Sequence, residues 1–376
     1  MKIGFAGGGT GGHFYPIIAV AEEVNKVVDE QKIIDCSLIY ISTDEYDKAA
    51  LLENGLKFEK IYAGKLRVYF SLKNFLDIWK TFFGVINAIF VLYRIYPDVI
   101  FSKGAYASFP TLFAARLLGI PVLMHESDCS PGRVNKWTGK FAKKIAVSFA
   151  EASTFFPSNK VALTGQPVRT ELREKSVSGM YEYFGLDSTL PVLWVVGGSQ
   201  GSQVLNDVIL EILPNALKKY QIIHVCGDKN VDSVKEQAKI VLGNEKELLS
   251  RYKVFGFLNS LGIKMAAGAS SLCITRGGSM LFELALWGLP AIVVPIEKSN
   301  GDHQRKNAFS FAKKGGAVVV EEANLDATIL ESEIDRILGN KDILDKMKES
   351  MYSSATPQAA RLIAEELVKI AQSHEK

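Results

Sequence analysis

Residues 3–12 read IGFAGGGTGG and residues 192–202 read VLWVVGGSQGS, so in both places an apolar strand runs directly into a glycine loop. A helix follows the first loop, because Ile17, Val20 and Val24 recur at helical spacing after it. Glycines let a backbone approach a phosphate closely, and a helix N-terminus supplies unpaired N–H groups for it. The two stretches therefore predict two strand–loop–helix units of the doubly wound α/β kind.

The rest of the chain extends this pattern into two domains. Short β-branched runs alternate with helical patterns throughout, which predicts parallel sheets with crossover helices. At 376 residues the chain is longer than one hydrophobic core usually supports. A Gly-Gln-Pro turn and a charged stretch favour a boundary that divides the chain into 1–167 and 168–356, with a helix at about 357–376 returning to the first domain. We expect a cleft between the two glycine-lined strand ends, where open α/β sheets bind ligands.

The bulk composition excludes several classes of protein. Hydrophobic residues make up 48% and charged residues 23% of the chain, which fits neither a disordered protein nor one with many membrane spans. The strand at the N-terminus leaves no room for a secretory signal, so we expect a cytoplasmic protein. The four cysteines have no zinc or redox spacing. Residues 60–144 carry 13 Lys or Arg against 4 Asp or Glu, which indicates an acidic partner, either nucleic acid or an anionic membrane surface.

The first glycine loop is not specific by itself. It contains G-x-G-x-x-G, which fits a dinucleotide-binding dehydrogenase with Asp44 as the ribose-binding carboxylate. Two further strand–glycine–helix units, at 197–201 and 275–279, have no obvious use in a dehydrogenase. His13 lies just before a helix, where it is poorly placed for core packing and well placed to face a ligand. These two features favour a nucleotide-dependent reaction other than hydride transfer.

Seven motifs strengthen that interpretation: GGGTGGHFYP, KGAYASFP, HESDCSPGRVNK, TGQPVR, GGSQGSQVLN, RGGSMLFELALWGLPAIVVP and GDHQRKNA. In this order they resemble the MurG family, whose fold is GT-B, with two doubly wound domains. The resemblance implies an inverting enzyme that moves N-acetylglucosamine from UDP-N-acetylglucosamine to the 4-hydroxyl of the muramoyl sugar of lipid I, which forms lipid II for peptidoglycan. It also implies a peripheral position on the cytoplasmic face of the cell membrane. The partners that it implies are the anionic inner leaflet of that membrane and other cell-wall synthesis proteins, and it implies no nucleic acid.

The resemblance further implies a role for particular residues. His13 is the candidate base, with Glu126 second if His13 only orients the acceptor. Leu258 matches the backbone edge at the uracil, and Glu283 the carboxylate on the ribose hydroxyls. The donor site is implied at Thr10, Gly11, Gly12, Arg169, Ser199, Gln200, Gly201, Leu258, Arg276, Gly277, Gly278, Ser279, Met280, Glu283, His303 and Gln304. The acceptor site is implied at Gly9, Tyr106, His125, Asp128 and Asn135.

The chemistry agrees with these roles. Inversion at the sugar needs a base near neutral pH and stabilisation of the departing diphosphate. A neutral imidazole at His13 supplies the first and helix N-termini supply the second, so the mechanism demands neither a metal nor another cofactor. Ser127 and Asp128 depart from the Gln and Asn of the family pattern. A carboxylate at position 128 would repel a diphosphate unless a cation such as Arg133 intervened.

Alternatives stay open both for single residues and for the function of the whole chain. Glu283 lies among apolar neighbours and is either paired or binding, His125 could be a support, and His303 with Gln304 could be solvated. The chain could also be a different GT-B enzyme, either a glycolipid glycosyltransferase or a UDP-N-acetylglucosamine 2-epimerase. A non-catalytic protein that binds UDP-sugars is the third alternative.

The segment FLDIWKTFFGVINAIFVLY, residues 75–93, is the candidate membrane contact. Polar residues, among them Asp77 and Asn87, interrupt it, so we do not expect it to span a bilayer. We expect its second half to pack against the N-terminal sheet. Aromatic and basic side chains mix around its first half, as at a membrane interface. This membrane patch comprises Lys65, Arg67, Phe70, Lys73, Phe75, Trp79, Lys80, Phe82 and Phe83.

Overall fold

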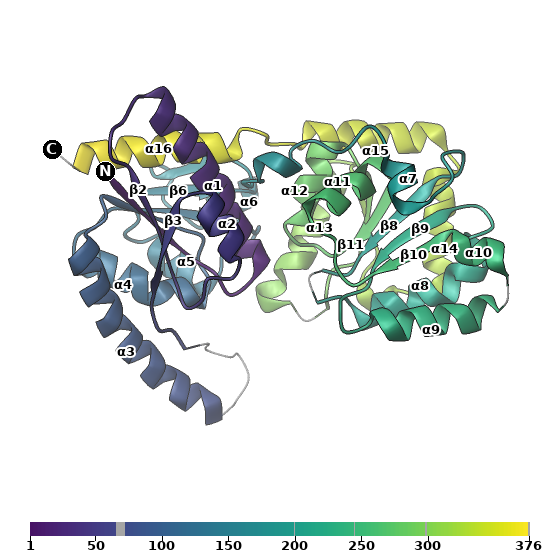
Figure 1. Ribbon diagram of the computed structural model, residues 1–376, viewed down its shortest axis with the longest axis horizontal. Helices are drawn as coiled ribbons and strands as arrows, with labels where there is room; N and C mark the ends of the chain where they lie inside the picture. The colour runs from purple at the N-terminus through teal and green to yellow at the C-terminus, as the bar shows by residue number, and fades with distance from the viewer. Residues whose placement is uncertain (65–71, 199, 244, 298, 375–376) are drawn as a thin grey trace. The chain divides into compact units, whose positions relative to one another are not determined.

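The chain forms two compact units in a computed structural model. Unit 1 comprises Met1–Thr170 with Thr356–Lys376, and unit 2 comprises Glu171–Ala355 (Figure 1). The structure describes residues 1–64, 72–198, 200–243, 245–297 and 299–374.

Unit 1 is built on one parallel sheet in which seven strands take the order β3-β2-β1-β4-β5-β6-β7. Its strands are β1 (Lys2–Ala6), β2 (Ser37–Ser42), β3 (Leu56–Lys60), β4 (Val99–Ser102), β5 (Val122–Glu126), β6 (Lys144–Val147) and β7 (Val161–Leu163). Its helices and 3₁₀ turns are α1 (Gly11–Glu30), α2 (Lys48–Glu53), α3 (Leu72–Ile95), η1 (Tyr106–Ser108), α4 (Phe109–Leu117), α5 (Arg133–Thr138), α6 (Ala150–Ser153) and α16 (Ala359–His374), with η2 (Thr170–Leu172) at its border with unit 2.

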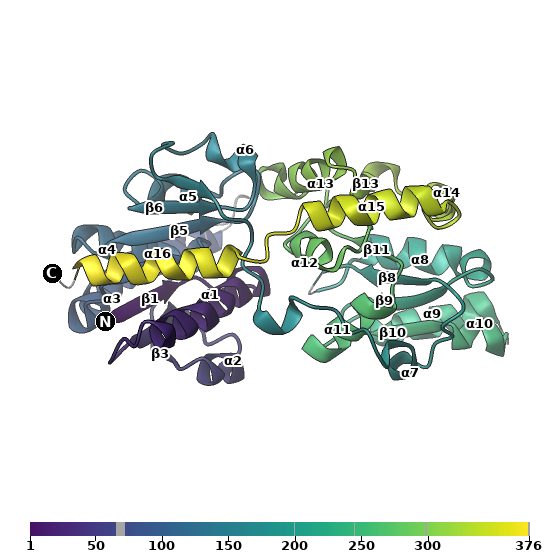
Figure 2. The same cartoon turned by 90° about the horizontal axis from the view of Figure 1, so that it is seen from above.

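Helices cover both faces of this sheet. On one face α1 and α16 lie side by side (Figure 2), and Ile3 and Phe5 of β1 pack into the same apolar cluster as these helices. On the other face Ala6 packs with residues of α3 and α4. Both faces are therefore buried, which explains why the strands read as continuous apolar runs instead of alternating with polar residues.

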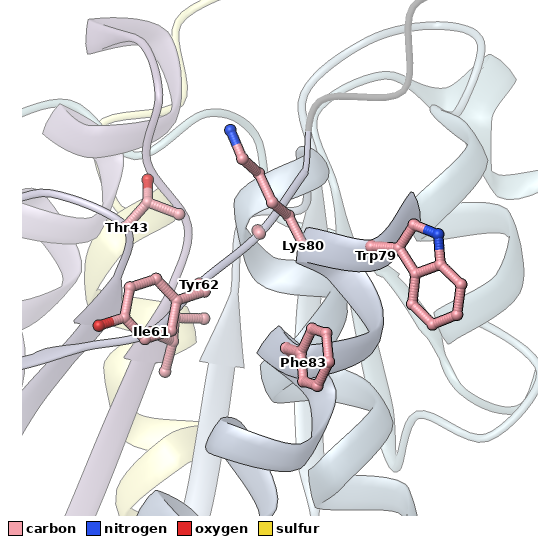
Figure 3. A pocket seen from close by; sticks show the side chains of 7 residues that line it. Thr43, Ile61, Tyr62, Trp79, Lys80 and Phe83 are labelled. Atoms are coloured by element: carbon pink, nitrogen blue, oxygen red, sulfur yellow. The ribbon is translucent and has the colours of Figure 1, made fainter. Parts of the chain in front are cut away.

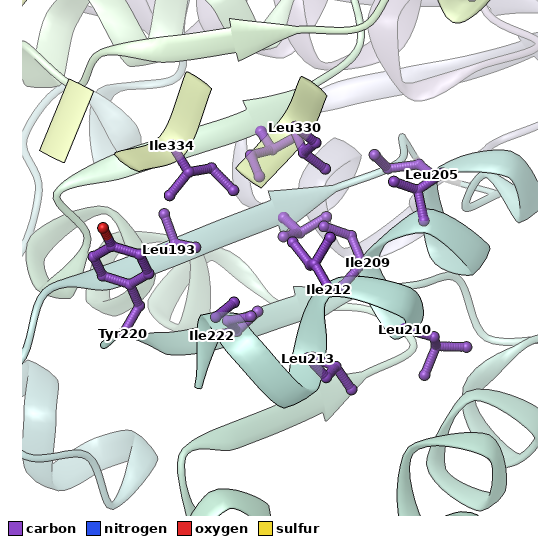
Figure 4. Packing of buried hydrophobic residues seen from close by; sticks show 14 of the residues in the cluster. Leu193, Leu205, Ile209, Leu210, Ile212, Leu213, Tyr220, Ile222, Leu330 and Ile334 are labelled. Carbon is purple, nitrogen blue, oxygen red and sulfur yellow. The ribbon is translucent and has the colours of Figure 1, made fainter. Parts of the chain in front are cut away.

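Unit 2 repeats the architecture with a parallel sheet in the order β10-β9-β8-β11-β12-β13. Its strands are β8 (Val192–Val196), β9 (Gln221–Val225), β10 (Tyr252–Phe255), β11 (Leu272–Thr275), β12 (Ala291–Val293) and β13 (Ala317–Val319). Its helices and turns are α7 (Met180–Phe184), α8 (Gln203–Ala216), α9 (Val231–Leu242), α10 (Lys246–Ser250), α11 (Ser260–Ala269), α12 (Met280–Trp287), η3 (Asn300–Asp302), α13 (His303–Lys313), η4 (Glu322–Asn324), α14 (Ala327–Leu338) and α15 (Lys341–Ser353). Leu193 of β8, Ile209 of α8 and Leu330 of α14 meet in its core (Figure 4).

Each sheet has a point at which the strand order reverses. In unit 1 the reversal is between β1 and β4, and in unit 2 between β8 and β11. Open α/β sheets bind ligands at the carboxyl ends of the strands beside such a point. The predicted fold class, two doubly wound parallel α/β domains, is confirmed.

Helix α3 packs one face against unit 1 and leaves its other face exposed. Between Asp77 and Ile95 it is long and apolar enough, by length and composition, to cross a membrane, yet 17% of this stretch is buried. Ala88 and Leu92 in its second half do pack with the sheet, whereas Phe90 and Tyr93 are 71% and 73% exposed. The prediction that the second half packs against the sheet therefore holds for one face of the helix, where Ile89 and Ile95 also pack against the cluster. The opposite face, with Phe90 and Tyr93, is exposed.

Candidate functional site

The loops at the carboxyl edge of the unit 1 sheet carry most of the residues predicted for the acceptor. The glycine loop follows β1, Lys103 follows β4, His125 and Glu126 end β5, Ser148 follows β6, and Gly165 and Gln166 follow β7. In a parallel sheet these ends meet at one edge.

The glycine loop takes a shape that only glycine accommodates. Gly8 and Gly9 have φ angles of +121° and +82°, and a Cβ on Gly8 would lie 2.4 Å from the Ser42 Oγ. A Cβ on Gly9 would lie 3.2 Å from the Tyr106 ring, so these two predicted acceptor residues are neighbours. Small residues here keep the backbone open to a ligand.

His13 lies in the first turn of α1, where its backbone N–H donates to the Thr10 carbonyl at 3.1 Å. Its side chain is half-buried and its Nδ1 is a buried atom. Thr10 is the exposed N-cap, and Gly11 and Gly12 open the helix without an acidic residue in the first turn. The positive end of the α1 dipole therefore lies at the predicted base.

Lys103 is a functional candidate that the sequence reasoning missed. It is 1% exposed, and its ammonium lies 2.6 Å from the His125 Nδ1 and 3.1 Å from the Gln166 Oε1 and also donates to the Ser127 Oγ. A signal was present, because a lysine directly after the apolar strand DVIFS is unusual in a buried parallel sheet. By sequence alone its charge belongs to the basic excess of residues 60–144.

His125 is a buried support in this network. Its Nε2 lies 2.9 Å from the Gly165 carbonyl, which only accepts hydrogen bonds, so the Nε2 carries the proton and the Nδ1 accepts from Lys103. Ser148 also lies within 3.2 Å of the Nε2. Burial first, and Lys103 second, hold the pKa of His125 well below its usual value. The side chain is therefore neutral, and both of its nitrogens are bonded within unit 1.

Glu126 holds the following loop together. Its Oε1 accepts from the Asp128 N–H at 2.9 Å, and its Oε2 accepts from the Gly132 N–H at 3.2 Å and from the Asn135 Nδ2 at 2.8 Å. Glu126 is 3% exposed, and Asn135 is 4% exposed. Both oxygens of Glu126 therefore hold the loop, which favours a supporting role for this carboxylate.

The pKa values of this cluster depart from their usual ranges. Burial lowers the pKa of Lys103 to about 7, although Glu126 and Asp128 act in the opposite direction. Burial and then the Asp128 carboxylate raise the pKa of Glu126. Perturbed groups of this kind, gathered at the end of a sheet, are typical of functional sites.

The edge of unit 2 is built mainly from backbone and glycine. Gly198 and Gly201 follow β8 with φ angles of +94° and +74°, and a Cβ on Gly201 would lie 1.9 Å from the Cys226 carbonyl oxygen. Gln200 is exposed, and Ser202 caps α8 by accepting from the Leu205 N–H at 3.3 Å. Ser199, which the resemblance places at the diphosphate, lies outside the described residues.

Arg276 joins three segments of this edge. Its guanidinium donates to the Val294 carbonyl at 2.9 Å, to the Glu322 carboxylate at 2.8 Å and to the Ser202 Oγ. It is 7% exposed, so it supports the glycine loop from behind. Burial opposes the downward shift, but the Glu297 N–H and Arg276 bring the net pKa of Glu322 below its usual value.

The remaining donor residues lie around the start of α12. A Cβ on Gly277 would lie 2.2 Å from the Gln304 carbonyl oxygen, whereas a Cβ on Gly278 would meet nothing within 4 Å. Glu283 is half-buried in the first turn of α12. The Gln304 side chain accepts from the Ile296 N–H at 3.1 Å, so it fixes the loop after β12.

The five remaining predicted donor residues lie in different parts of the fold. Ser279 and Met280 begin α12, and His303 begins α13, all three half-buried. Leu258, 6% exposed, follows β10 and therefore lies two strands from the β8 loop. Arg169 places its guanidinium 4.0 Å from the centre of the Tyr15 ring on α1, within unit 1.

A hollow in unit 1 contains part of the predicted membrane patch. It is lined by Thr43, Ile61, Tyr62, Ala63, Trp79, Lys80 and Phe83 (Figure 3). The patch residues Lys65, Arg67 and Phe70, and the side chains of Lys73 and Phe75, lie outside the described residues. Among the residues that the structure describes, no three His, Cys, Asp or Glu side chains gather as metal ligands.

Comparisons with known proteins match this arrangement over the whole chain. Residues 3–147 match the glycosyltransferase family 28 N-terminal domain, and residues 192–366 match the family 28 C-terminal domain. A relative from Clostridium novyi (strain NT), named UDP-N-acetylglucosamine–N-acetylmuramyl-(pentapeptide) pyrophosphoryl-undecaprenol N-acetylglucosamine transferase, is 34% identical and aligns over 100% of this chain and 99% of its own. A protein of the same name from Treponema denticola is 35% identical over 84% of this chain and 83% of its own.

Solved structures share the fold. The crystal structure of Acinetobacter baumannii MurG has a TM-score of 0.72 at 24% identity and covers 98% of this chain and 99% of its own. The UDP-GlcNAc 2-epimerase of Neisseria meningitidis, solved with UDP-GlcNAc, has a TM-score of 0.72 at 16% identity over 98% and 100% of the two chains. At these identities the structural likeness defines the fold and leaves the reaction open.

Proposed function

Because this chain belongs to glycosyltransferase family 28 and is MurG-like over its whole length, we propose that it transfers N-acetylglucosamine from UDP-N-acetylglucosamine to lipid I and so forms lipid II. The observation that carries the proposal is the 34% identity over the full chain to a relative whose name states this donor and this acceptor. Both family 28 domains are present in order.

We assign the donor to unit 2. The glycine loop after β8 and the N-terminus of α12 offer backbone N–H groups for a diphosphate. Glu283, in the first turn of α12, is the acceptor group for the ribose hydroxyls. Departing UDP is then stabilised by helix ends and hydrogen bonds, so a metal is not required by this assignment.

We assign the acceptor to the edge of unit 1, with His13 as the base. In its neutral form the imidazole takes the proton of the attacking hydroxyl. The bonds of Glu126 to Asp128, Gly132 and Asn135 favour a supporting role for this carboxylate.

We further propose that the exposed face of α3 holds the enzyme on the membrane. Large apolar side chains recur along this face with exposed fractions of 38–73%: Ile78, Trp79, Phe82, Phe83, Ile86, Phe90 and Tyr93. The rings of Trp79, Phe82 and Phe83 lie 5.5–6.4 Å apart and form one cluster. An apolar face of this length on a solvent-exposed surface is typical of a protein or membrane contact.

This part of the proposal is tested by co-sedimentation with vesicles. We expect binding to anionic vesicles that weakens with salt, and its loss when Trp79, Phe82 and Phe83 are all changed to Ser, since each ring contributes on the order of 1 kcal/mol. The matched control changes Val177 and Ile240, which are 83% and 80% exposed in unit 2, to Ser. Undiminished binding of the α3 variant would contradict the assignment.

The UDP-N-acetylglucosamine 2-epimerase activity is the second candidate, because enzymes of that name share the fold. One assay separates the two. Purified protein is incubated with UDP-N-acetylglucosamine, with and without a lipid I analogue and with other UDP-sugars as controls. We expect disaccharide-lipid and UDP only when both substrates are present. Conversion of the UDP-sugar to its 2-epimer without acceptor would indicate the epimerase, and binding without turnover a non-catalytic protein.

A further inference from the structure

Lys103 is a buried cation whose presence the transfer reaction does not by itself explain. Its ammonium has three acceptors on three different segments: His125 at the end of β5, Ser127 in the next loop and Gln166 after β7. Burying an ammonium costs several kcal/mol unless hydrogen bonds and nearby charge offset it. A residue that only filled space at this position could be apolar.

The loop that Lys103 holds carries two carboxylates. Glu126 accepts hydrogen bonds from the Asp128 and Gly132 N–H groups of this loop. Lys103 donates a hydrogen bond to Ser127 in the same loop. Asp128 is half-buried, so it lies at the surface of this loop. Arg133, the cation expected from the sequence, is exposed on α5, whereas Lys103 is fully buried. Charges interact more strongly at a buried position because water screens them less.

We propose that Lys103 is a positioning residue for the acceptor: it fixes His125 and Ser127 and, in its protonated form, supplies the positive charge that lets the Asp128 loop lie against the acceptor diphosphate. This inference rests on the proposed function. It accounts for the carboxylate at position 128, because the cation beneath the loop offsets the repulsion between Asp128 and an anionic ligand.

The first test is Lys103→Met, which keeps most of the length of the side chain and removes its charge. We expect the KM for a lipid I analogue to rise at least tenfold, while the KM for UDP-N-acetylglucosamine changes less than twofold. The matched control is Lys57→Met, an exposed lysine on β3 of the same unit. Equal rises in both KM values would contradict the proposal.

A second substitution separates charge from packing. If Lys103 acts by offsetting Asp128, the double variant Lys103→Met with Asp128→Asn should recover most of the lost acceptor affinity. A purely structural lysine would leave the double variant as impaired as Lys103→Met, and that result would overturn the inference.

Asp128→Asn alone keeps the test decisive if Lys103→Met does not fold, since Asp128 is half-buried and Lys103 stays in place. The site then carries one more net positive charge, and we expect the KM for the lipid I analogue to fall about three- to tenfold. An unchanged KM would show that the loop lies away from the diphosphate and would overturn the inference. Transfer by the parent enzyme is measured in every series, so a chain without transferase activity refutes the proposed function separately.

Discussion

The carboxyl edges of the two sheets share a strand–glycine–helix unit, but the groups around this unit differ between them. In unit 1 ionisable side chains are buried behind the loops: Lys103, His125 and Glu126 bond to one another or to the loops they support. In unit 2 the guanidinium of Arg276 supports the loop after β8, and glycine and backbone predominate in the described part of this loop. A backbone cradle suits a diphosphate that is bound and released. A set of perturbed side chains suits proton transfer. The comparison therefore predicts that substitutions in unit 1 change turnover or acceptor affinity and that substitutions in unit 2 reduce nucleotide binding.

The largest expected effect is that of His13→Ala. We expect turnover to fall by about two to four orders of magnitude, the usual contribution of a general base, while UDP affinity stays the same. His374→Ala is the matched control, because this histidine also belongs to unit 1 but lies 3.7 Å from Asp98, which precedes β4 at the opposite edge of the sheet. Turnover near the parent rate for His13→Ala would mean that His13 is not the base. It would contradict the assignment of proton transfer to the edge of unit 1.

Glu283→Ala tests the other side of the comparison. We expect UDP and UMP to bind more weakly by about 1.5–3 kcal/mol, because a charged acceptor of the ribose hydroxyls is lost. Free N-acetylglucosamine lacks the ribose, so its binding should not change. Calorimetry is the measurement, with Glu236→Ala, an exposed glutamate on α9, as the control. Equal UDP affinity in both variants would return Glu283 to a structural role in α12.

The perturbed pKa of Lys103 predicts how stability depends on pH. The pKa is about 7 in the native state against 10.5 for an ordinary lysine. Between these values the unfolded chain binds more protons than the native one, so native stability rises with pH through this window and is lost as pH falls toward 7. The free energy of unfolding of the parent, measured relative to Lys103→Met by urea titration at several pH values, should rise by at most about 1.4 kcal/mol per pH unit. A constant difference from pH 7 to 10 would mean that Lys103 titrates normally.

The sequence predicted the fold and the glycine loops because their signals are local. The step from an apolar run to glycine and then to helical spacing lies within one short segment, as at residues 3–12. The role of Lys103 depends on Gln166 and His125, which lie 63 and 22 residues away in sequence, and on strand neighbours that only the sheet order defines. The exposure of Phe90 and Tyr93 in the second half of α3 was missed for a related reason: periodicity marks an apolar helix but does not tell how much of its circumference the protein covers.

The smallest expected effect concerns the turn that follows Lys103. Ala105 has φ 68° and ψ 167°, a region that is essentially restricted to glycine. Such a conformation costs on the order of 1–3 kcal/mol, and glycine at this position would relieve it at an entropic cost of about 0.5–1 kcal/mol. Ala105→Gly should therefore raise the free energy of unfolding by about 1 kcal/mol in urea titration. Ala107→Gly, two residues later in the buried η1 turn, has no such strain to relieve and should lower it by about 1 kcal/mol. If both changes destabilised the protein equally, Ala105 would be unstrained. Opposite signs would place stored backbone strain at the edge of unit 1, between the buried lysine and Tyr106, and would sharpen the contrast with the glycine-built edge of unit 2.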